Sequence, residues 1–80
     1  MAIDAPKIVT AIAGEYKLDL PERIVMLHYD EQSDTLYVHF EYPSKAGTSD
    51  VVDEHGEVVL GLGEDGKPAN LTIINASRFL

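Results

Sequence analysis

The stretch Arg23-Ile-Val-Met-Leu-His-Tyr29, followed after a short polar segment by Thr35-Leu-Tyr-Val-His-Phe40, decides the fold. Both runs are rich in β-branched and aromatic residues, which favour strands. The polar segment between them, Asp30-Glu-Gln-Ser-Asp34, is typical of a turn. We therefore expect an antiparallel hairpin, in a register that pairs Tyr29 with Thr35.

That register divides the side chains of the hairpin between two faces, because successive residues of a strand point to opposite sides. The face expected beneath a helix carries Ile24, Met26, Leu36, Val38 and Phe40. The second face carries Val25, Leu27, Tyr29, Tyr37 and His39. Both sets are largely apolar, and one helix can cover only one of them. We therefore predict that the second set is a candidate interface.

Upstream of the hairpin, an amphipathic helix is predicted over residues 4–16. Asp4 suits its N-cap and Pro6 its first turn. The apolar residues of its expected inner face recur every four positions: Ile8, Ile12 and Tyr16. Leu20-Pro21 ends the helical pattern, because proline pushes the preceding residue into an extended conformation.

Downstream, short apolar segments alternate with turns that contain Gly56 and Gly66. The pattern predicts an α+β domain in which the N-terminal helix packs on an antiparallel meander of about five short strands. The expected strands cover residues 23–29, 35–41, 49–53, 58–62 and 69–74. A loop is expected at 43–48, and residues 75–80 form a short helix or a tail.

Composition limits the functions open to this chain. Eighty residues make a single domain, whose core is marginal for its size, and the chain has no cysteine to reinforce it. The formal charge of −8 disfavours nucleic acid and anionic membranes, both of which attract basic residues. No signal peptide and no membrane-spanning run is seen, so a cytoplasmic location is expected.

Several segments resemble one small prokaryotic family, catalogued as domain of unknown function 2283. They are Tyr29-Asp30, Asp34-Thr-Leu-Tyr-Val38, Thr48-Ser-Asp50, Glu64-Asp-Gly66 and Leu71-Thr-Ile-Ile-Asn-Ala-Ser77. The resemblance implies a small helix-plus-sheet domain and carries over no catalytic residue. Some members look like the smaller partner of a toxin-like protein, which suggests an antitoxin-type role. Pro68-Ala69 departs from the family pattern and predicts a shortened last strand.

Two motifs imitate ligand-binding loops. Gly61-Leu-Gly63-Glu-Asp-Gly66 matches a dinucleotide fingerprint, but a strand follows it where a helix N-terminus is required. Asp30, Gln32, Asp34 and Glu41 have the spacing of a calcium loop, but Thr35 replaces the glycine that such a loop needs. We interpret both segments as hairpin turns.

No catalytic, cofactor or metal site is predicted. In the expected register, His28 and His39 lie on opposite faces and His55 lies in a turn, so the histidines do not converge. No serine or threonine has an evident histidine and acid partner, and the chain is not expected to be an enzyme.

Two functions remain. The first is a non-enzymatic module that self-associates or binds another protein, most simply as a homodimer. The alternative is a ligand or divalent-cation binder that uses the acidic turn residues Asp50, Asp53, Glu54 and Glu57. A fold in which Phe79-Leu80 covers the second sheet face would instead leave a monomer.

Overall fold

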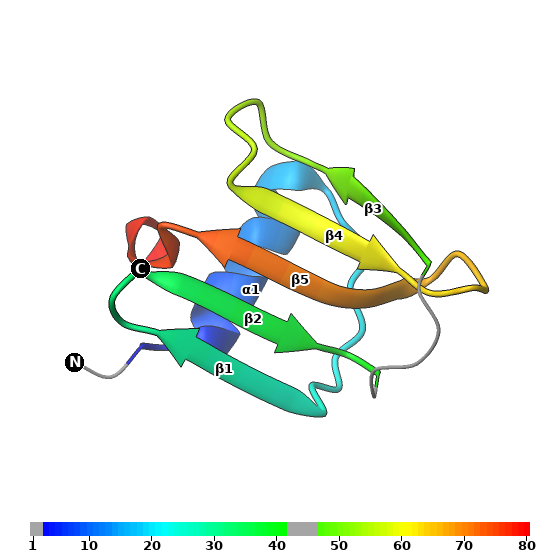
Figure 1. The fold of residues 1–80 in the computed structure, drawn as a ribbon, viewed down its shortest axis with the longest axis horizontal. Helices are drawn as coiled ribbons and strands as arrows, with labels where there is room; N and C mark the ends of the chain where they lie inside the picture. The colour runs from blue at the N-terminus through cyan, green and yellow to red at the C-terminus, as the bar shows by residue number, and fades with distance from the viewer. Residues whose placement is uncertain (1–2, 42–46) are drawn as a thin grey trace.

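The computed structural model describes residues 3–41 and 47–80. Within these ranges, helix α1 (Ala5–Tyr16) packs on a five-stranded antiparallel sheet (Figure 1). The strands are β1 (Met26–Asp30), β2 (Thr35–His39), β3 (Thr48–Val51), β4 (Val58–Leu62) and β5 (Pro68–Ile74). A 3₁₀ helix, η1 (Ala76–Phe79), follows β5. The predicted α+β class and N-terminal helix are confirmed; the loop expected at 43–48 lies mostly outside the described residues.

The strand order is β1-β2-β5-β4-β3, which differs from the predicted meander. Consecutive hairpins β1–β2, β3–β4 and β4–β5 form as expected, but β5 inserts between β2 and β4. The burial pattern explains this order. β5 contributes the fully buried Leu71 and Ile73, whereas all four residues of β3 are exposed and suit an edge. β5 is also the longest strand, so the shortening predicted from Pro68 is wrong.

Helix α1 begins and ends at recognisable signals. The carboxylate of Asp4 accepts a hydrogen bond from the N–H of Lys7 at 3.1 Å, and Pro6 lies in the first turn. At the other end, Lys17 adopts a left-handed conformation with φ 56°. Its N–H donates to the carbonyl of Ala13, which closes the last turn.

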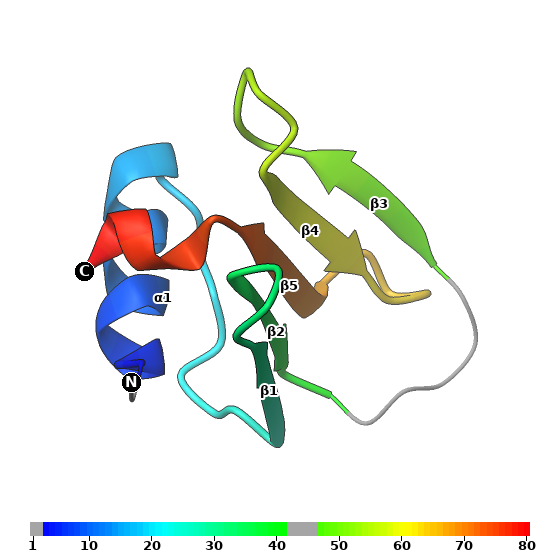
Figure 2. The ribbon, with the colours of Figure 1, turned by 60° about the vertical axis from the view of Figure 1, so that its left-hand side comes forward.

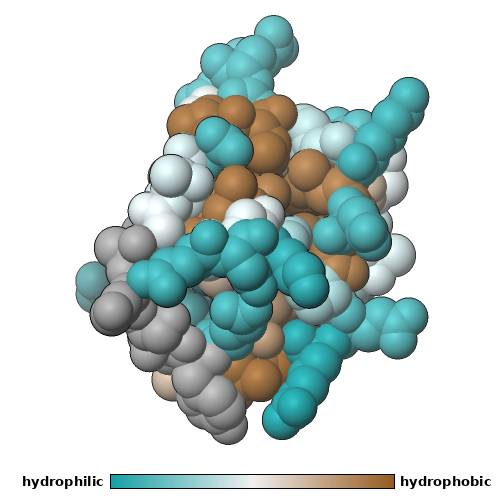
Figure 3. Space-filling model, turned by 90° about the vertical axis from the view of Figure 1, so that its right-hand side faces the viewer, coloured by the Kyte–Doolittle hydropathy of each residue, from teal (hydrophilic) through white to brown (hydrophobic). Residues whose placement is uncertain are grey.

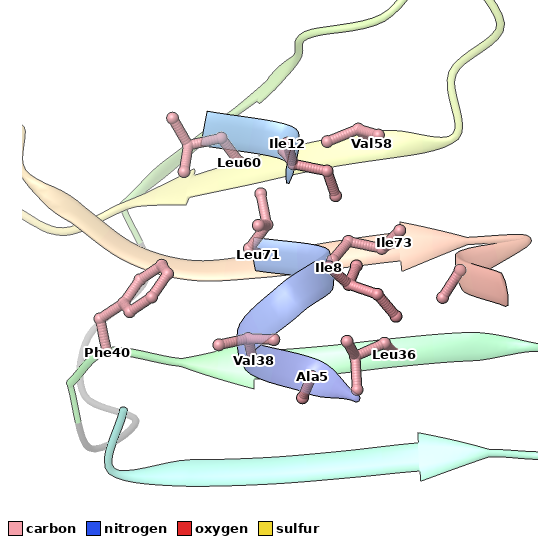
Figure 4. Packing of buried hydrophobic residues seen from close by; sticks show 11 residues of the cluster. Ala5, Ile8, Ile12, Leu36, Val38, Phe40, Val58, Leu60, Leu71 and Ile73 are labelled. Atoms are coloured by element: carbon pink, nitrogen blue, oxygen red, sulfur yellow. The ribbon is translucent and has the colours of Figure 1, made fainter. Parts of the chain in front are cut away.

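The core lies between α1 and the sheet (Figure 4). Ile8 lies near Leu36 and Ile73, and Ile12 lies near Val58. These five side chains are completely buried, as are Val38 and Leu71. The predicted inner positions Leu36, Val38 and Phe40 are confirmed as buried.

The register of β1 against β2 is shifted by one residue from the prediction. Tyr29 pairs with Leu36, and Asp30 pairs with Thr35. The turn has four residues, 31–34, in place of the five expected, because Asp34 closes it with a positive φ of 50° and Asp30 joins the strand. A shift of one residue moves every side chain of a strand to the other face.

The shift corrects two sets of predicted positions. Leu27 and Tyr29 lie on the α1 side of the sheet with their partners Val38 and Leu36. Met26, predicted to be inward, lies on the opposite side and is 46% exposed. Ile24, which precedes β1, still packs against the core as predicted.

The C-terminal residues lie on the same side of the sheet as α1 (Figure 2). Phe79 packs against the core from that side. The alternative in which Phe79-Leu80 covers the second face of the sheet is therefore wrong.

Leu36 and Leu27 provide a matched test of this arrangement. Leu36→Ala should lower the free energy of unfolding by about 2–4 kcal/mol, because Leu36 is completely buried. Leu27→Ala should cost about 1 kcal/mol or less, because 44% of Leu27 is exposed. Urea denaturation measures both values, and equal losses would contradict the difference in burial between Leu27 and Leu36.

Candidate functional site

The face of the sheet that points away from α1 is called here the open face. By strand alternation and pairing, its positions are Met26, His28, Asp30, Thr35, Tyr37, His39, Ser49, Val51, Val59, Gly61, Asn70, Thr72 and Ile74. Figure 1 looks onto this face, since α1 lies behind the sheet. None of the described helices covers it.

The open face is almost free of charge. The chain has 14 acidic residues, yet Asp30 is the one open-face position with a formal charge when histidine is neutral. Its large apolar residues are accessible to solvent: Tyr37 is 37% exposed, Met26 46% and Val51 60%. Depletion of charge around exposed aromatic and methionine side chains is the composition typical of the centre of a protein interface.

One aromatic contact orders the β1–β2 side of the open face. The rings of His28 and Tyr37 stack, with 6.0 Å between their centroids and 23° between their planes. The two residues are direct cross-strand partners, so the stack follows from the shifted register.

The five residues of the predicted interface do not share one face. Tyr37 and His39 lie on the open face, whereas Leu27 and Tyr29 lie on the α1 side. Val25 precedes β1, and its N–H donates to the carbonyl of His39. The prediction missed Met26, His28, Val51 and Ile74 on the open face. The positions of Met26 and His28 could have been predicted from Asp34, because aspartate tolerates the left-handed conformation that closes a shorter turn.

A second cluster consists of Tyr29, Asp34 and Ser77. Hydrogen bonds hold it together, in contrast to the apolar residues of the open face. The Tyr29 hydroxyl donates to Oδ1 of Asp34 at 2.5 Å, and the Ser77 hydroxyl donates to Oδ2 at 2.6 Å. The N–H of Ser77 also points at this carboxylate, at 3.2 Å from Oδ1. The N–H of Ala76 donates to the backbone carbonyl of Asp34. Asp34 thus fastens the start of η1 to the β1–β2 turn.

These hydrogen bonds shift two pKa values in opposite directions. Donation by Ser77 and Tyr29 lowers the pKa of Asp34 below its ordinary value, against the opposing effect of burial. The same carboxylate raises the pKa of Tyr29 to about 12, chiefly through the hydrogen bond that it accepts. The hydrogen bond to the carboxylate fixes the orientation of the Ser77 hydroxyl.

A third cluster surrounds Asp53 in the turn between β3 and β4. Its Oδ1 accepts hydrogen bonds from the N–H groups of Glu57 at 2.7 Å and Val58 at 3.0 Å. Arg78 of η1 lies 3.4 Å from both Asp53 and Glu57, and the Asn75 amide donates to Glu57. Burial acts to raise the pKa of Asp53, but the backbone hydrogen bonds and Arg78 outweigh it, so that pKa is lowered.

The acidic turns hold their own chain together. Asp53 and Glu57, two of the four predicted cation ligands, are engaged by backbone N–H groups, Asn75 and Arg78. Among residues 3–41 and 47–80, no group of three or more histidine, aspartate or glutamate side chains is placed to hold a metal ion. His55 lies in the same turn, 3.4 Å from Glu54.

A shallow groove of about 290 Å³ runs beside α1. It is lined mainly by small and apolar residues of α1 and of the segment that leads to β1: Pro6, Val9, Thr10, Ala13, Leu20, Pro21, Glu22 and Ile24.

Figure 3 views the end of the sheet at the turn of residues 64–67 and shows hydrophobic side chains in the middle of that face, partly covered by hydrophilic ones. In the described part of the chain, no helix is long and apolar enough to cross a membrane.

Ser77→Ala tests the Asp34 cluster through its pH dependence. Because the folded-state pKa of Asp34 lies below the unfolded value of about 3.9, the ionised carboxylate contributes stability above that value. The contribution is lost as the pH falls through the folded-state value. The loss of melting temperature caused by Ser77→Ala should therefore be largest near pH 7 and shrink below about pH 4. Ser33→Ala, in the exposed part of the same turn, is the control, and a Ser77→Ala deficit that is constant from pH 7 to pH 2.5 would contradict the assignment.

Tyr29 should ionise later than an ordinary tyrosine, whose pKa is about 10. Absorbance titration of the phenolate should show one group with a pKa of about 12. Tyr29→Phe should remove that group, and Asp34→Asn should return it towards the ordinary value by taking away the carboxylate. Tyr37→Phe, which leaves the cluster intact, should retain the late titration. If the late titration disappears in Tyr37→Phe, the raised pKa does not belong to Tyr29.

Comparison with known proteins places the chain in a family. No curated protein and no solved structure matches it significantly. One family, described as "Protein of unknown function (DUF2283)", matches residues 26–77. The match begins at β1 and ends in η1, so it includes the whole sheet, the Asp34 cluster, and the Asp53 cluster except for Arg78. Because it covers more than half of the sequence, the chain belongs to the DUF2283 family.

Proposed function

We propose that this chain is a non-enzymatic interaction module that self-associates through its open face. The observation that carries the proposal is the charge pattern. Fourteen acidic residues are distributed over a small domain, and Asp30 alone among them occupies an open-face position. Exposed aromatic and aliphatic residues on a face with a single formal charge are typical of a surface that is covered in its working state.

A second copy is the partner that this pattern favours. Two chains of charge −8 repel each other wherever their carboxylates approach. The open face lets two such chains meet with few charges between them, and salt screens the rest beyond about 8–10 Å. A basic partner would instead be attracted to the acidic turns and would gain little from an uncharged sheet.

The size of the face predicts a modest affinity. Five strands about 4.8 Å apart and roughly 17 Å long give a face of about 400 Å². Two copies would then bury about 800 Å² or somewhat more, which is less than the roughly 1,200–2,000 Å² of stable specific interfaces and is typical of weak, transient ones. We expect a concentration-dependent homodimer in the micromolar range.

The alternative, in which the acidic turns bind a cation, has weaker support. Two of its proposed ligands, Asp53 and Glu57, already form ion pairs with Arg78. The proposal includes a cytoplasmic location in a prokaryotic cell. The family resemblance supports the prokaryotic source, and a chain without cysteine needs no oxidising compartment in order to fold.

Tyr37→Glu tests the open face directly, because it places a carboxylate beside the His28 ring on the β1–β2 side of that face. Light scattering of the wild type at tens of micromolar should give a mass near twice 8.8 kDa, and Tyr37→Glu should return it to 8.8 kDa. Ala11→Glu adds the same charge on the exposed surface of α1 and should leave the dimer unchanged.

Circular dichroism melts would show that both variants are folded. A wild-type mass of 8.8 kDa over the whole concentration range would overturn the proposal. So would equal effects of the two glutamate substitutions, because they would attribute the change to net charge and not to the face.

A further inference from the structure

The shifted register brings two histidines to the same side of the sheet. His28 lies at the centre of β1 opposite Tyr37, and His39 lies two residues farther along β2 than Tyr37. Both are open-face positions, since Leu36, Val38 and Phe40 point into the core. His28 and His39 are therefore diagonal neighbours, a separation that long side chains can bridge. Their placement on opposite faces in the predicted register is wrong.

Two imidazoles on one face are half of a transition-metal site. Imidazole nitrogen is a common ligand of Zn²⁺, which takes four ligands in a tetrahedron. No third ligand from the described residues joins the pair. Asp30, the nearest acidic position on β1, accepts a hydrogen bond from the N–H of Gln32 and is committed to the turn.

We propose that His28 and His39 form one half of a Zn²⁺ site that the same two histidines of a second copy complete. The inference rests on the proposed self-association, because one chain alone offers two ligands. It also gives the two histidines a common role in a face on which Asp30 is the one position with a formal charge.

The geometry of stacked sheets suits such a site. A two-fold axis in the plane between the copies, running across the strands, places each strand over its own counterpart and keeps the faces overlapped. Packed sheets lie about 10 Å apart, so an ion midway between them is about 5 Å from each sheet, within reach of an imidazole. Stacking on Tyr37 restricts the orientation of the His28 ring, which reduces the entropy lost when it binds the ion.

Charge favours the same arrangement. Neutral imidazoles add no charge to the interface, and a Zn²⁺ ion brings two positive charges between two chains of −8 each. The ion therefore lowers the repulsion that opposes association.

The experiment measures association and metal content together. Protein freed of metal with EDTA and then dialysed is examined by sedimentation velocity, with and without ZnCl₂ at half the chain concentration. We expect Zn²⁺ to lower the dimer dissociation constant by about tenfold or more, and calorimetric titration to give one ion per two chains. His28→Gln and His39→Gln should each abolish the Zn²⁺ effect. His55→Gln, in the exposed β3–β4 turn, should retain it and serves as the control.

The outcomes separate this inference from the proposed function. A dimer in EDTA that Zn²⁺ does not tighten would overturn the metal site and leave self-association intact. A chain that stays monomeric with and without Zn²⁺ would overturn both. One ion bound per chain without association, or a Zn²⁺ effect that survives His28→Gln and His39→Gln, would overturn the shared site. A Zn²⁺-dependent dimer that needs both histidines would support it, even if the metal-free chain is monomeric.

Discussion

The left-handed backbone of Asp34 determines how the rest of the molecule is arranged. Its positive φ closes a four-residue turn between β1 and β2, and the length of that turn fixes which side of the sheet each residue of β1 occupies. Its carboxylate then accepts hydrogen bonds from Tyr29 on the preceding strand and from Ser77, 43 residues later in the chain. One residue thus sets a local register and fastens the C-terminal segment. The carboxylate is satisfied by donors on both sides, so the unfavourable backbone conformation is stabilised by the contacts that it makes possible.

The sheet separates two kinds of surface. On the α1 side, Ile8 and Ile12 cover the inner positions of β2, β4 and β5, and Phe79 of η1 adds to that cover. Arg78 connects η1 to Asp53 and Glu57 at the β3–β4 turn, and its guanidinium lies 4.4 Å from the centre of the Phe79 ring. The charged and hydrogen-bonded residues are thereby engaged at the ends of the strands. The open face keeps the aromatic, aliphatic and imidazole side chains, and this separation is the basis of the functional proposal.

Local signals in the sequence were sufficient for the elements but not for their assembly. Asp4, Pro6 and the four-residue spacing of Ile8 and Ile12 specify α1, and each acts over a few residues. The alternation of Leu36, Val38 and Phe40 identifies the inner face of β2. The order of the strands depends on contacts between distant segments, so no local pattern shows that β5 lies beside β2. The face of β1 depended on a single turn conformation, and a one-residue error there exchanged Met26 and His28 for Leu27 and Tyr29. Of the predicted interface residues, Tyr37 and His39 were therefore placed on the correct face.

The central position of β5 has a consequence for biosynthesis. This strand follows the other four in the sequence, yet it is the one that joins the β1–β2 hairpin to the β3–β4 hairpin. Until it emerges, the two hairpins share no backbone hydrogen bonds, and α1 has no continuous sheet to cover. Chains generally fold from the N-terminal end as they are made, but here the two hairpins have to wait for β5 before they can join in one sheet.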